Sequence, residues 1–164
     1  MLMPERLESH LARYHIAYSL ILHGPAHSAQ LAASFMHIPG KQVAKTVALC
    51  AGEKPLLAVL PASHYINFAT LSAIAGEKVQ LMEEQKCNEL FPDCETGAIP
   101  PFGELYDVPV YMDQALADDP EIVFSTGTAS YSVRMGNADF VHLVKPTVCS
   151  FAEKNLEASK LSNA

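Results

Sequence analysis

Two apolar segments joined by a short polar turn decide the fold class of this chain. The first reads VAKTVALC over residues 43–50, the second reads LLAVL over residues 56–60, and the turn between them is AGEKP, residues 51–55. Short apolar runs rich in valine and leucine, bounded by glycine and proline, are typical of β-strands. We therefore predict two paired strands around this turn.

The sequence on either side alternates between helical and extended patterns. Helices are predicted for residues 4–15, for a segment that Ser28 caps and Pro39 ends, for residues 63–75 and 83–90, and for a last helix capped by Asn137 and running through Val144. Further strands are predicted for residues 17–22, 79–82, 108–112, 122–125 and 131–135. Because helices and strands are interspersed, the predicted fold class is α/β or α+β with a mixed sheet.

Length and composition fit one domain with little affinity for DNA or membranes. The chain has 164 residues, of which 49% are hydrophobic, so it can bury one sizeable core. We place the domain at residues 1–149 and expect a polar, loosely held tail at residues 150–164. The formal net charge of −7 argues against binding to long duplex DNA. No apolar run reaches the ~20 residues of a membrane helix, and no signal peptide is apparent, so we expect a cytoplasmic protein.

Cysteines and histidines lack the spacing of metal ligands. Six residues separate Cys87 from Cys94, which is not the spacing of a zinc knuckle. His23 and His27 are four residues apart, but a glycine and a proline between them prevent a helix that would align the two rings. We therefore expect free thiols, no bound metal and no cofactor.

Lys45 interrupts the apolar pattern of the first strand. Alternation along the strand places its side chain on the face shared with Val43, Val47 and Leu49. A lysine in such a run either reaches solvent at a sheet edge, where it discourages aggregation, or points into a polar cavity. The residues alone leave both interpretations open.

The second unusual segment is the irregular stretch of residues 91–103, which contains three prolines and two glycines. Within it, GAIPP at residues 97–101 forms a stiff loop with one permissive glycine. Such a loop can hold main-chain N–H groups in a fixed direction toward a carbonyl or an oxyanion, although an ordinary surface turn has a similar composition. STGT at residues 125–128 offers hydroxyls and amides at a strand end, but it is neither a P-loop nor a nucleophile elbow.

In combination these motifs resemble the YbaK/EbsC family, which includes the editing domain of bacterial prolyl-tRNA synthetases and free-standing ProXp-type deacylases. The resemblance covers residues 4 to 146. Lys45 matches the functional lysine of the family, and Gly97 and Pro101 match its G-x-x-x-P loop about fifty residues later. Ser125 and Gly127 match a serine-x-glycine element that lines the pocket. The resemblance implies a single YbaK-like domain with a mixed, curved sheet surrounded by helices.

The implied activity is hydrolysis of the ester that joins a wrong amino acid to the 3′ end of a tRNA. Family members use a positioned water in place of a protein nucleophile or a metal, in agreement with the absence of a recognisable nucleophile–base pair in this sequence. Lys45 would hold the terminal phosphate or ribose, and the loop from Gly97 to Pro101 would fix the ester carbonyl. The residues implied to bind substrate are His27, Ser28, Thr46, Ile99, Pro100, Phe102, Ser125, Gly127 and Ser132.

Two positions differ from the subgroup patterns of the family. Thr46 stands where some alanine-specific members have asparagine, and Ser132 stands where cysteine-specific members have an acid. The partners implied are the acceptor end of an aminoacyl-tRNA, with tRNA-Pro as one candidate, and an aminoacyl-tRNA synthetase. Because the chain is acidic, a local basic patch would have to contact the tRNA, with Lys41, Lys45, Arg134 and Lys145 as candidates.

Two other functions fit the same residues. The domain could be a non-catalytic module that senses an amino acid or a tRNA end, or it could hydrolyse another small ester. The presence of both Lys45 and the Gly97 loop favours the deacylase, since a sensor does not need both. The sequence does not name the amino acid removed, the tRNA or the oligomeric state.

Overall fold

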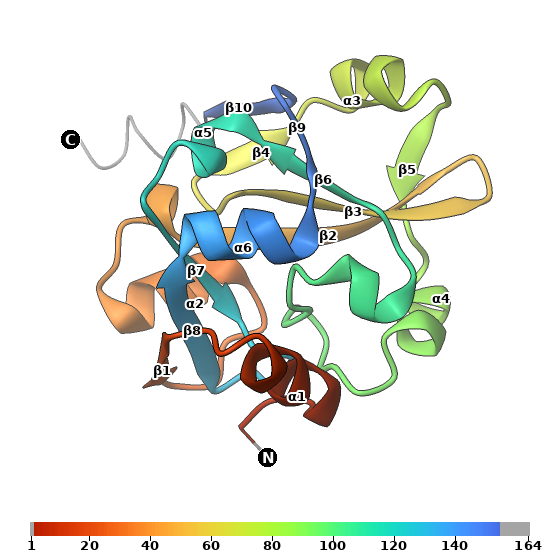
Figure 1. Cartoon of the computed structure of the whole chain (residues 1–164). Helices are drawn as coiled ribbons and strands as arrows, with labels where there is room; N and C mark the ends of the chain where they lie inside the picture. Colours follow the sequence, from red (N-terminus) through yellow and green to blue (C-terminus); the bar gives the residue numbers. More distant parts are fainter. Residues whose placement is uncertain (1, 155–164) are drawn as a thin grey trace.

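The computed structural model describes residues 2–154, and its largest element is a five-stranded mixed sheet (Figure 1). The strand order is β5-β2-β3-β6-β9, with bounds β2 Ala44–Ala51, β3 Lys54–Pro61, β5 Val79–Leu81, β6 Val110–Asp113 and β9 Thr147–Cys149. Strands β2 and β3 pair antiparallel, which confirms the predicted hairpin, whereas β6 runs parallel to β3 and β9 parallel to β6. The mixed α/β class predicted from the sequence is confirmed.

A second sheet meets the first at the beginning of β2. It has the order β1-β8-β7, with bounds β1 Tyr18–Leu22, β7 Glu121–Ser125 and β8 Tyr131–Gly136. A parallel bridge between Val43 and Val123 joins the sheets. The carboxyl end of β7 therefore lies beside the first residues of β2, although about eighty residues separate them in sequence.

Six helices surround the sheets within the described chain. Their bounds are α1 Glu5–Arg13, α2 Ala29–Met36, α3 Phe68–Ala75, α4 Glu84–Leu90, α5 Gln114–Ala117 and α6 Asn137–Val144, and two 3₁₀ turns cover Gly40–Gln42 and Gly103–Tyr106. Helix α6 packs on the β7–β8 sheet and lies across its junction with the larger one (Figure 1). None of the helices in residues 2–154 is long and apolar enough to cross a membrane.

Two predicted helix ends are confirmed by their capping geometry. The Ser28 hydroxyl accepts a hydrogen bond of 3.1 Å from the N–H of Leu31 at the start of α2. Helix α3 ends at Gly76, whose φ of +81° places it in the left-handed region that glycine adopts without strain.

Two predicted helix beginnings are wrong. In place of a helix from residue 63, β4 (His64–Ile66) comes first, and α3 begins after Asn67, whose side-chain oxygen accepts from the N–H of Thr70. Asn137 does not cap α6 but is its buried first residue, and its side-chain amide donates to the carbonyls of Leu116 and Asp119, at 2.9 and 2.8 Å. Asn137 thus ties α6 to the end of α5, a long-range role that local sequence does not indicate.

The expected loose tail is wrong for its first residues. Phe151 is buried, and its N–H donates to a carboxylate oxygen of Asp113 at 2.9 Å. Strand β10 (Ala152–Lys154) then pairs antiparallel with β4. The packed domain therefore extends past residue 149, and the remainder of the predicted tail lies outside the described residues.

The N-terminal helix packs on the 3₁₀ turn at residues 103–106 through a contact between His10 and Glu104. His10 Nε2 lies 3.3 Å from a Glu104 carboxylate oxygen. Burial raises the pKa of Glu104 to about 7, whereas burial, followed by the nearby charge of Arg13, lowers the pKa of His10. Because both shifts favour the uncharged forms, we treat this contact as a neutral pair and not as an ion pair.

Glu104 should make the folded state less stable as the pH rises. A carboxyl with a raised folded-state pKa binds its proton more tightly in the folded protein, so stability falls between the unfolded-state pKa near 4.5 and the folded-state pKa of about 7. We expect Glu104→Gln to be more stable than the wild type at pH 8, with a smaller difference at pH 5. Urea unfolding at both pH values measures this change. Glu53→Gln, at an exposed turn, is the control, and an equal effect of the two variants would contradict the prediction.

Candidate functional site

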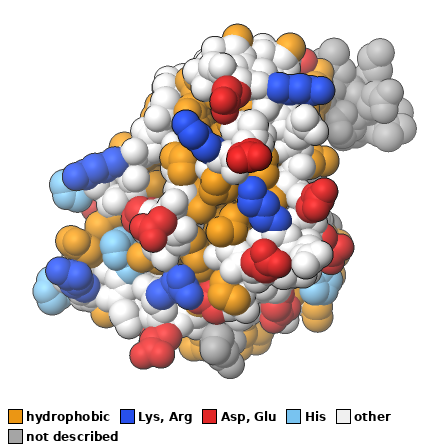
Figure 2. Space-filling view, turned by 90° about the vertical axis from the view of Figure 1, so that its right-hand side faces the viewer, with side chains coloured by type: hydrophobic (Ala, Val, Ile, Leu, Met, Phe, Trp, Pro, Cys, Tyr) orange, Lys and Arg blue, Asp and Glu red, His pale blue; other side chains and the backbone are white. Residues whose placement is uncertain are grey.

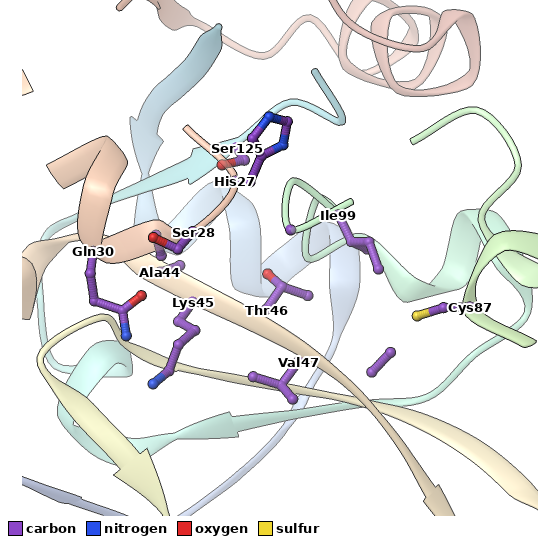
Figure 3. A pocket seen from close by; sticks show the side chains of 13 residues that line it. His27, Ser28, Gln30, Ala44, Lys45, Thr46, Val47, Cys87, Ile99 and Ser125 are labelled. Atoms are coloured by element: carbon purple, nitrogen blue, oxygen red, sulfur yellow. The ribbon is translucent and has the colours of Figure 1, made fainter. Parts of the chain in front are cut away.

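A cavity of about 280 Å³ lies between the first half of β2, the beginning of α2 and the loop around Gly97 (Figure 3). Seven of the residues proposed from the sequence line it, namely His27, Ser28, Lys45, Thr46, Gly97, Ile99 and Ser125. They come from four separate segments of the chain. The fold therefore brings the strand that carries Lys45 and the loop that carries Gly97 to one cavity.

The cavity runs along a free edge of β2. All five residues from Ala44 to Ala48 line it, although neighbouring side chains of a strand point to opposite faces. Pairing with β5 covers only Leu49–Ala51 within the described chain, so the first half of β2 has no neighbouring strand opposite β3 there. This edge offers main-chain groups to a ligand.

The pairing pattern shows which main-chain groups these are. The N–H of Leu57 donates to the carbonyl of Pro109, so Leu57 and, two residues on, Val59 direct their main-chain groups toward β6. Thr46 is the partner of Val59 in the β2–β3 register, and it therefore forms a non-hydrogen-bonded pair with it. The N–H and C=O of Thr46 consequently point to the cavity side of β2.

Lys45 lies on the other side of this strand from Thr46. Figure 3 shows the Thr46 side chain extending toward Ile99 and the Lys45 side chain extending away from it. Lys45 is half-buried, and its ammonium donates a hydrogen bond of 2.6 Å to the carbonyl of His64. Burial lowers the pKa of this amine. Lys45 thus lies at a sheet edge and also lines the cavity.

The loop that carries Gly97 packs directly on the main chain of His27. Gly97 has a φ of +76°, and a Cβ atom placed on it would lie 1.8 Å from the carbonyl oxygen of His27. The His27 Nδ1 atom lies 3.1 Å from the carbonyl oxygen of Thr96. The cavity wall therefore requires glycine at position 97 for two reasons, its positive φ and its close approach to another segment.

The remaining loop residues support this wall from behind. Pro100, Pro101 and Phe102 are buried and do not line the cavity. The Phe102 ring lies 5.4 Å, centroid to centroid, from each of the rings of Phe124 and Phe140. We conclude that these residues, which the resemblance implied to act on or bind substrate, hold the loop in place.

Gly127 and Ser132 also lie away from the cavity. Gly127 has a φ of +107° and packs against Pro4, and its carbonyl accepts a hydrogen bond of 2.7 Å from the N–H of Glu95. Ser132 is buried, and its hydroxyl is 2.9 Å from Nε2 of His23. Ser125, the register partner of Ser132 in the β7–β8 pair, does line the cavity.

Cys87 on α4 is a lining residue that sequence reasoning missed. Burial raises the pKa of its thiol, so the uncharged form is favoured. Together with Gly97 and Ile99, Cys87 also borders a second cavity of about 300 Å³ that contains Phe91 in its lining. No sequence motif marks Cys87. It lies on α4, outside the motifs around Lys45, Gly97 and Ser125, and only the packing of that helix brings it to the site. In residues 2–154, no three histidine, cysteine or carboxylate side chains group as metal ligands would.

Gly97→Ala should destabilise the protein more than the same change at another left-handed glycine. Gly76 is the matched control because its φ is +81° and a Cβ there would meet nothing within 4 Å. Backbone strain alone should cost Gly76→Ala about 1–2 kcal/mol in the free energy of unfolding. Gly97→Ala should lose a further ~1–3 kcal/mol through overlap with His27. Equal losses in urea unfolding of the two variants would show that the close approach to His27 is unimportant.

Comparisons with known proteins identify the family and the fold of this chain. The family model for the aminoacyl-tRNA editing domain matches residues 23–143. The hypothetical protein APE2540 has a similar solved structure, with 17% identity and a TM-score of 0.82 over 91% of this chain and 100% of the other. A candidate trans-editing enzyme for prolyl-tRNA synthetase has 19% identity and a TM-score of 0.78 over 90% of this chain and 95% of the other. No curated protein matches the chain. The matched segment covers most of the chain and includes every residue that lines the cavity, and the chain therefore belongs to the aminoacyl-tRNA editing domain family.

Proposed function

We propose that this protein is a trans-editing deacylase that hydrolyses the ester of a mischarged aminoacyl-tRNA. Family membership supports an editing function. The observation that carries the proposal further is that Lys45 and Gly97, brought together from segments about fifty residues apart, line one cavity with a free strand edge. We further propose that the protein works in the cytoplasm, alone or beside an aminoacyl-tRNA synthetase.

In this proposal the cation of Lys45 holds the terminal phosphate or ribose of the tRNA. An ammonium group has three N–H donors, and one of them is used by the carbonyl of His64. Two donors therefore remain for oxygens of the nucleic acid. The His64 carbonyl at the same time limits the directions in which the lysine can point, which favours one position for the bound end.

The main-chain groups around the cavity supply the remaining contacts with the ester. The loop at Gly97 and the edge of β2 at Thr46 are rigid, because the first packs on His27 and the second belongs to a sheet. Fixed N–H groups stabilise the negative charge that develops on a carbonyl oxygen when water attacks it. The cavity volume of about 280 Å³ favours a small amino acid as the acyl group.

The charge distribution fits recognition of only a short part of the tRNA. On the face shown in Figure 2, lysine and arginine side chains alternate with acidic ones around an apolar strip, without a broad basic surface. Of the four basic candidates, Lys45 lines the cavity, whereas Arg134 borders a different hollow with Glu121. Few phosphate contacts imply weak binding with a shallow dependence on salt.

A panel of mischarged tRNAs tests the proposed function. Ala-, Cys- and Ser-charged tRNA, including Ala-tRNA-Pro, would be incubated with the protein, and release of the amino acid would be measured. We expect faster hydrolysis of at least one of them than in buffer. A sensor module would bind without hydrolysis, and an enzyme for another small ester would leave every charged tRNA intact, so either result would refute the proposal.

Lys45→Ala should abolish or greatly weaken deacylation while the protein stays folded. Loss of the cation should misplace the ester relative to its water, and an error of about 1 Å can cost ~100-fold in rate. Lys45→Arg should restore little activity, because a planar guanidinium is larger and directs its donors differently. The measurement is kcat/KM on the aminoacyl-tRNA that the panel identifies, with circular dichroism to check folding.

Lys54→Ala is the matched control for this test. Lys54 lies in the same hairpin, is exposed and does not line the cavity, so its loss should leave the rate unchanged. If a folded Lys45→Ala protein keeps full activity, Lys45 is a structural residue and the assignment of the site is wrong.

A further inference from the structure

We infer that His27 is the general base that takes a proton from the attacking water, a role that rests on the proposed function. The observation behind this inference is the contact of its ring with the loop that carries Gly97. His27 is exposed at the mouth of the cavity and lines it together with Lys45 and Ser125 (Figure 3). The resemblance to the editing family implied only that His27 contacts substrate.

The hydrogen bond of His27 determines which ring nitrogen carries the proton. Nδ1 of His27 lies 3.1 Å from the carbonyl oxygen of Thr96, and a carbonyl oxygen can only accept a hydrogen bond. Nδ1 must therefore be the protonated nitrogen. In the neutral ring, Nε2 is then left with a free lone pair, which is the state that a general base requires.

The other titratable groups near the cavity are less suited to accept a proton. No aspartate or glutamate lines it within the described chain. Lys45 is a cation that donates to the carbonyl of His64, and the thiol of Cys87 favours its protonated form because burial raises its pKa. On the neighbouring loop, a carboxylate oxygen of Glu95 accepts from the N–H of Ala129 at 3.2 Å. His27 is the lining side chain that can act as a neutral base.

The same contact fixes the distance between this base and the loop proposed to hold the ester. The main chain of His27 is packed against Gly97, and the ring of His27 is hydrogen-bonded to the carbonyl oxygen of Thr96, the residue before Gly97. A base and an oxyanion-binding loop that are attached to each other keep their relative position during the reaction. Such fixed positioning is what hydrolysis by a single water requires.

The proposed step balances without any further reactant. The oxygen of water bonds to the ester carbonyl carbon while Nε2 of His27 takes one proton from that water. When the tetrahedral intermediate collapses, the bond between the carbonyl carbon and the ribose oxygen breaks. Nε2 returns its proton to the ribose oxygen, so the products are the free amino acid and a tRNA with an intact terminal hydroxyl, and the imidazole is neutral again.

His27→Asn separates the two functions of the ring. The asparagine amide can occupy the position of Nδ1 and donate to the carbonyl of Thr96, but it has no basic nitrogen in the position of Nε2. We expect kcat on the most rapidly hydrolysed of the Ala-, Cys- and Ser-charged tRNAs to fall about 100-fold or more, with little change in KM. His27→Ala should lose a similar factor in kcat and also raise KM, since the hydrogen bond from the ring to the carbonyl of Thr96 is lost as well.

The split between kcat and KM gives a readout that a purely structural role would not produce. A residue that only holds the loop should change KM or the free energy of unfolding together with kcat, whereas loss of a base lowers kcat alone. His27→Gln, whose amide is placed one carbon further from the main chain, should lose kcat like His27→Asn, because it also lacks a basic nitrogen. His142→Asn, at an exposed position on α6, is the control for rate and folding.

Each outcome of this experiment has a distinct meaning. If the wild type hydrolyses none of the charged tRNAs, the proposed function fails and the role of His27 fails with it. If the wild type is active and folded His27→Asn keeps its kcat, or loses kcat only together with a matching rise in KM, the inference about His27 is wrong and the proposed function stands. A large loss of kcat with little change in KM supports both.

Discussion

The close packing of Gly97 on the main chain of His27 is the contact on which the geometry of the cavity depends. It joins the loop at residues 91–103 to the segment before α2, two parts of the chain that lie about seventy residues apart. No side chain fits between them, because a Cβ atom on Gly97 would overlap the carbonyl oxygen of His27. Moving this contact would move the cavity wall, the histidine ring and the cap of α2 together.

The rigidity of the loop comes from the residues that do not reach the cavity. Pro100 and Pro101 restrict the backbone, and Phe102 is buried against Phe124 and Phe140. Burying a phenylalanine side chain contributes roughly 1.5–3 kcal/mol, which offsets the cost of ordering about one or two loop residues at ~1–2 kcal/mol each. The prolines reduce that cost further, because they already restrict the unfolded chain. Together these residues order a segment without regular secondary structure, so that its amides can be oriented before a ligand arrives.

The parts of the fold predicted correctly from sequence depend on local patterns. The hairpin of β2 and β3 follows from two apolar runs and a polar turn, and the start of α2 follows from Ser28. The errors concern residues whose partners are distant in sequence. Strand β4 pairs with β10, which lies almost ninety residues later in a segment that looks like a polar tail.

The residues of the candidate site also divide into those that local sequence indicates and those that depend on distant parts of the chain. Lys45 and Gly97 were found through their unusual local sequence, whereas the edge of β2 at Thr46 depends on where β5 stops pairing. Ser132 and Ser125 are register partners and share a face of the sheet, but Ser132 lies on the central strand β8 and Ser125 on the edge strand β7, which is the one that reaches the cavity. Cys87 was missed because it depends on the position of α4. Such features become visible only when the register and packing of the sheets are known.

The free edge of β2 has a consequence for how this domain can change during evolution. Every residue except proline carries the same main-chain donor and acceptor, so a ligand bound along a strand edge constrains the path of the backbone and leaves the side chains free to vary. Proteins that share this architecture can then diverge to the 17–19% identity seen here while their backbones still superpose with TM-scores near 0.8. In such a lineage, the path of the backbone is conserved more strongly than the amino-acid sequence.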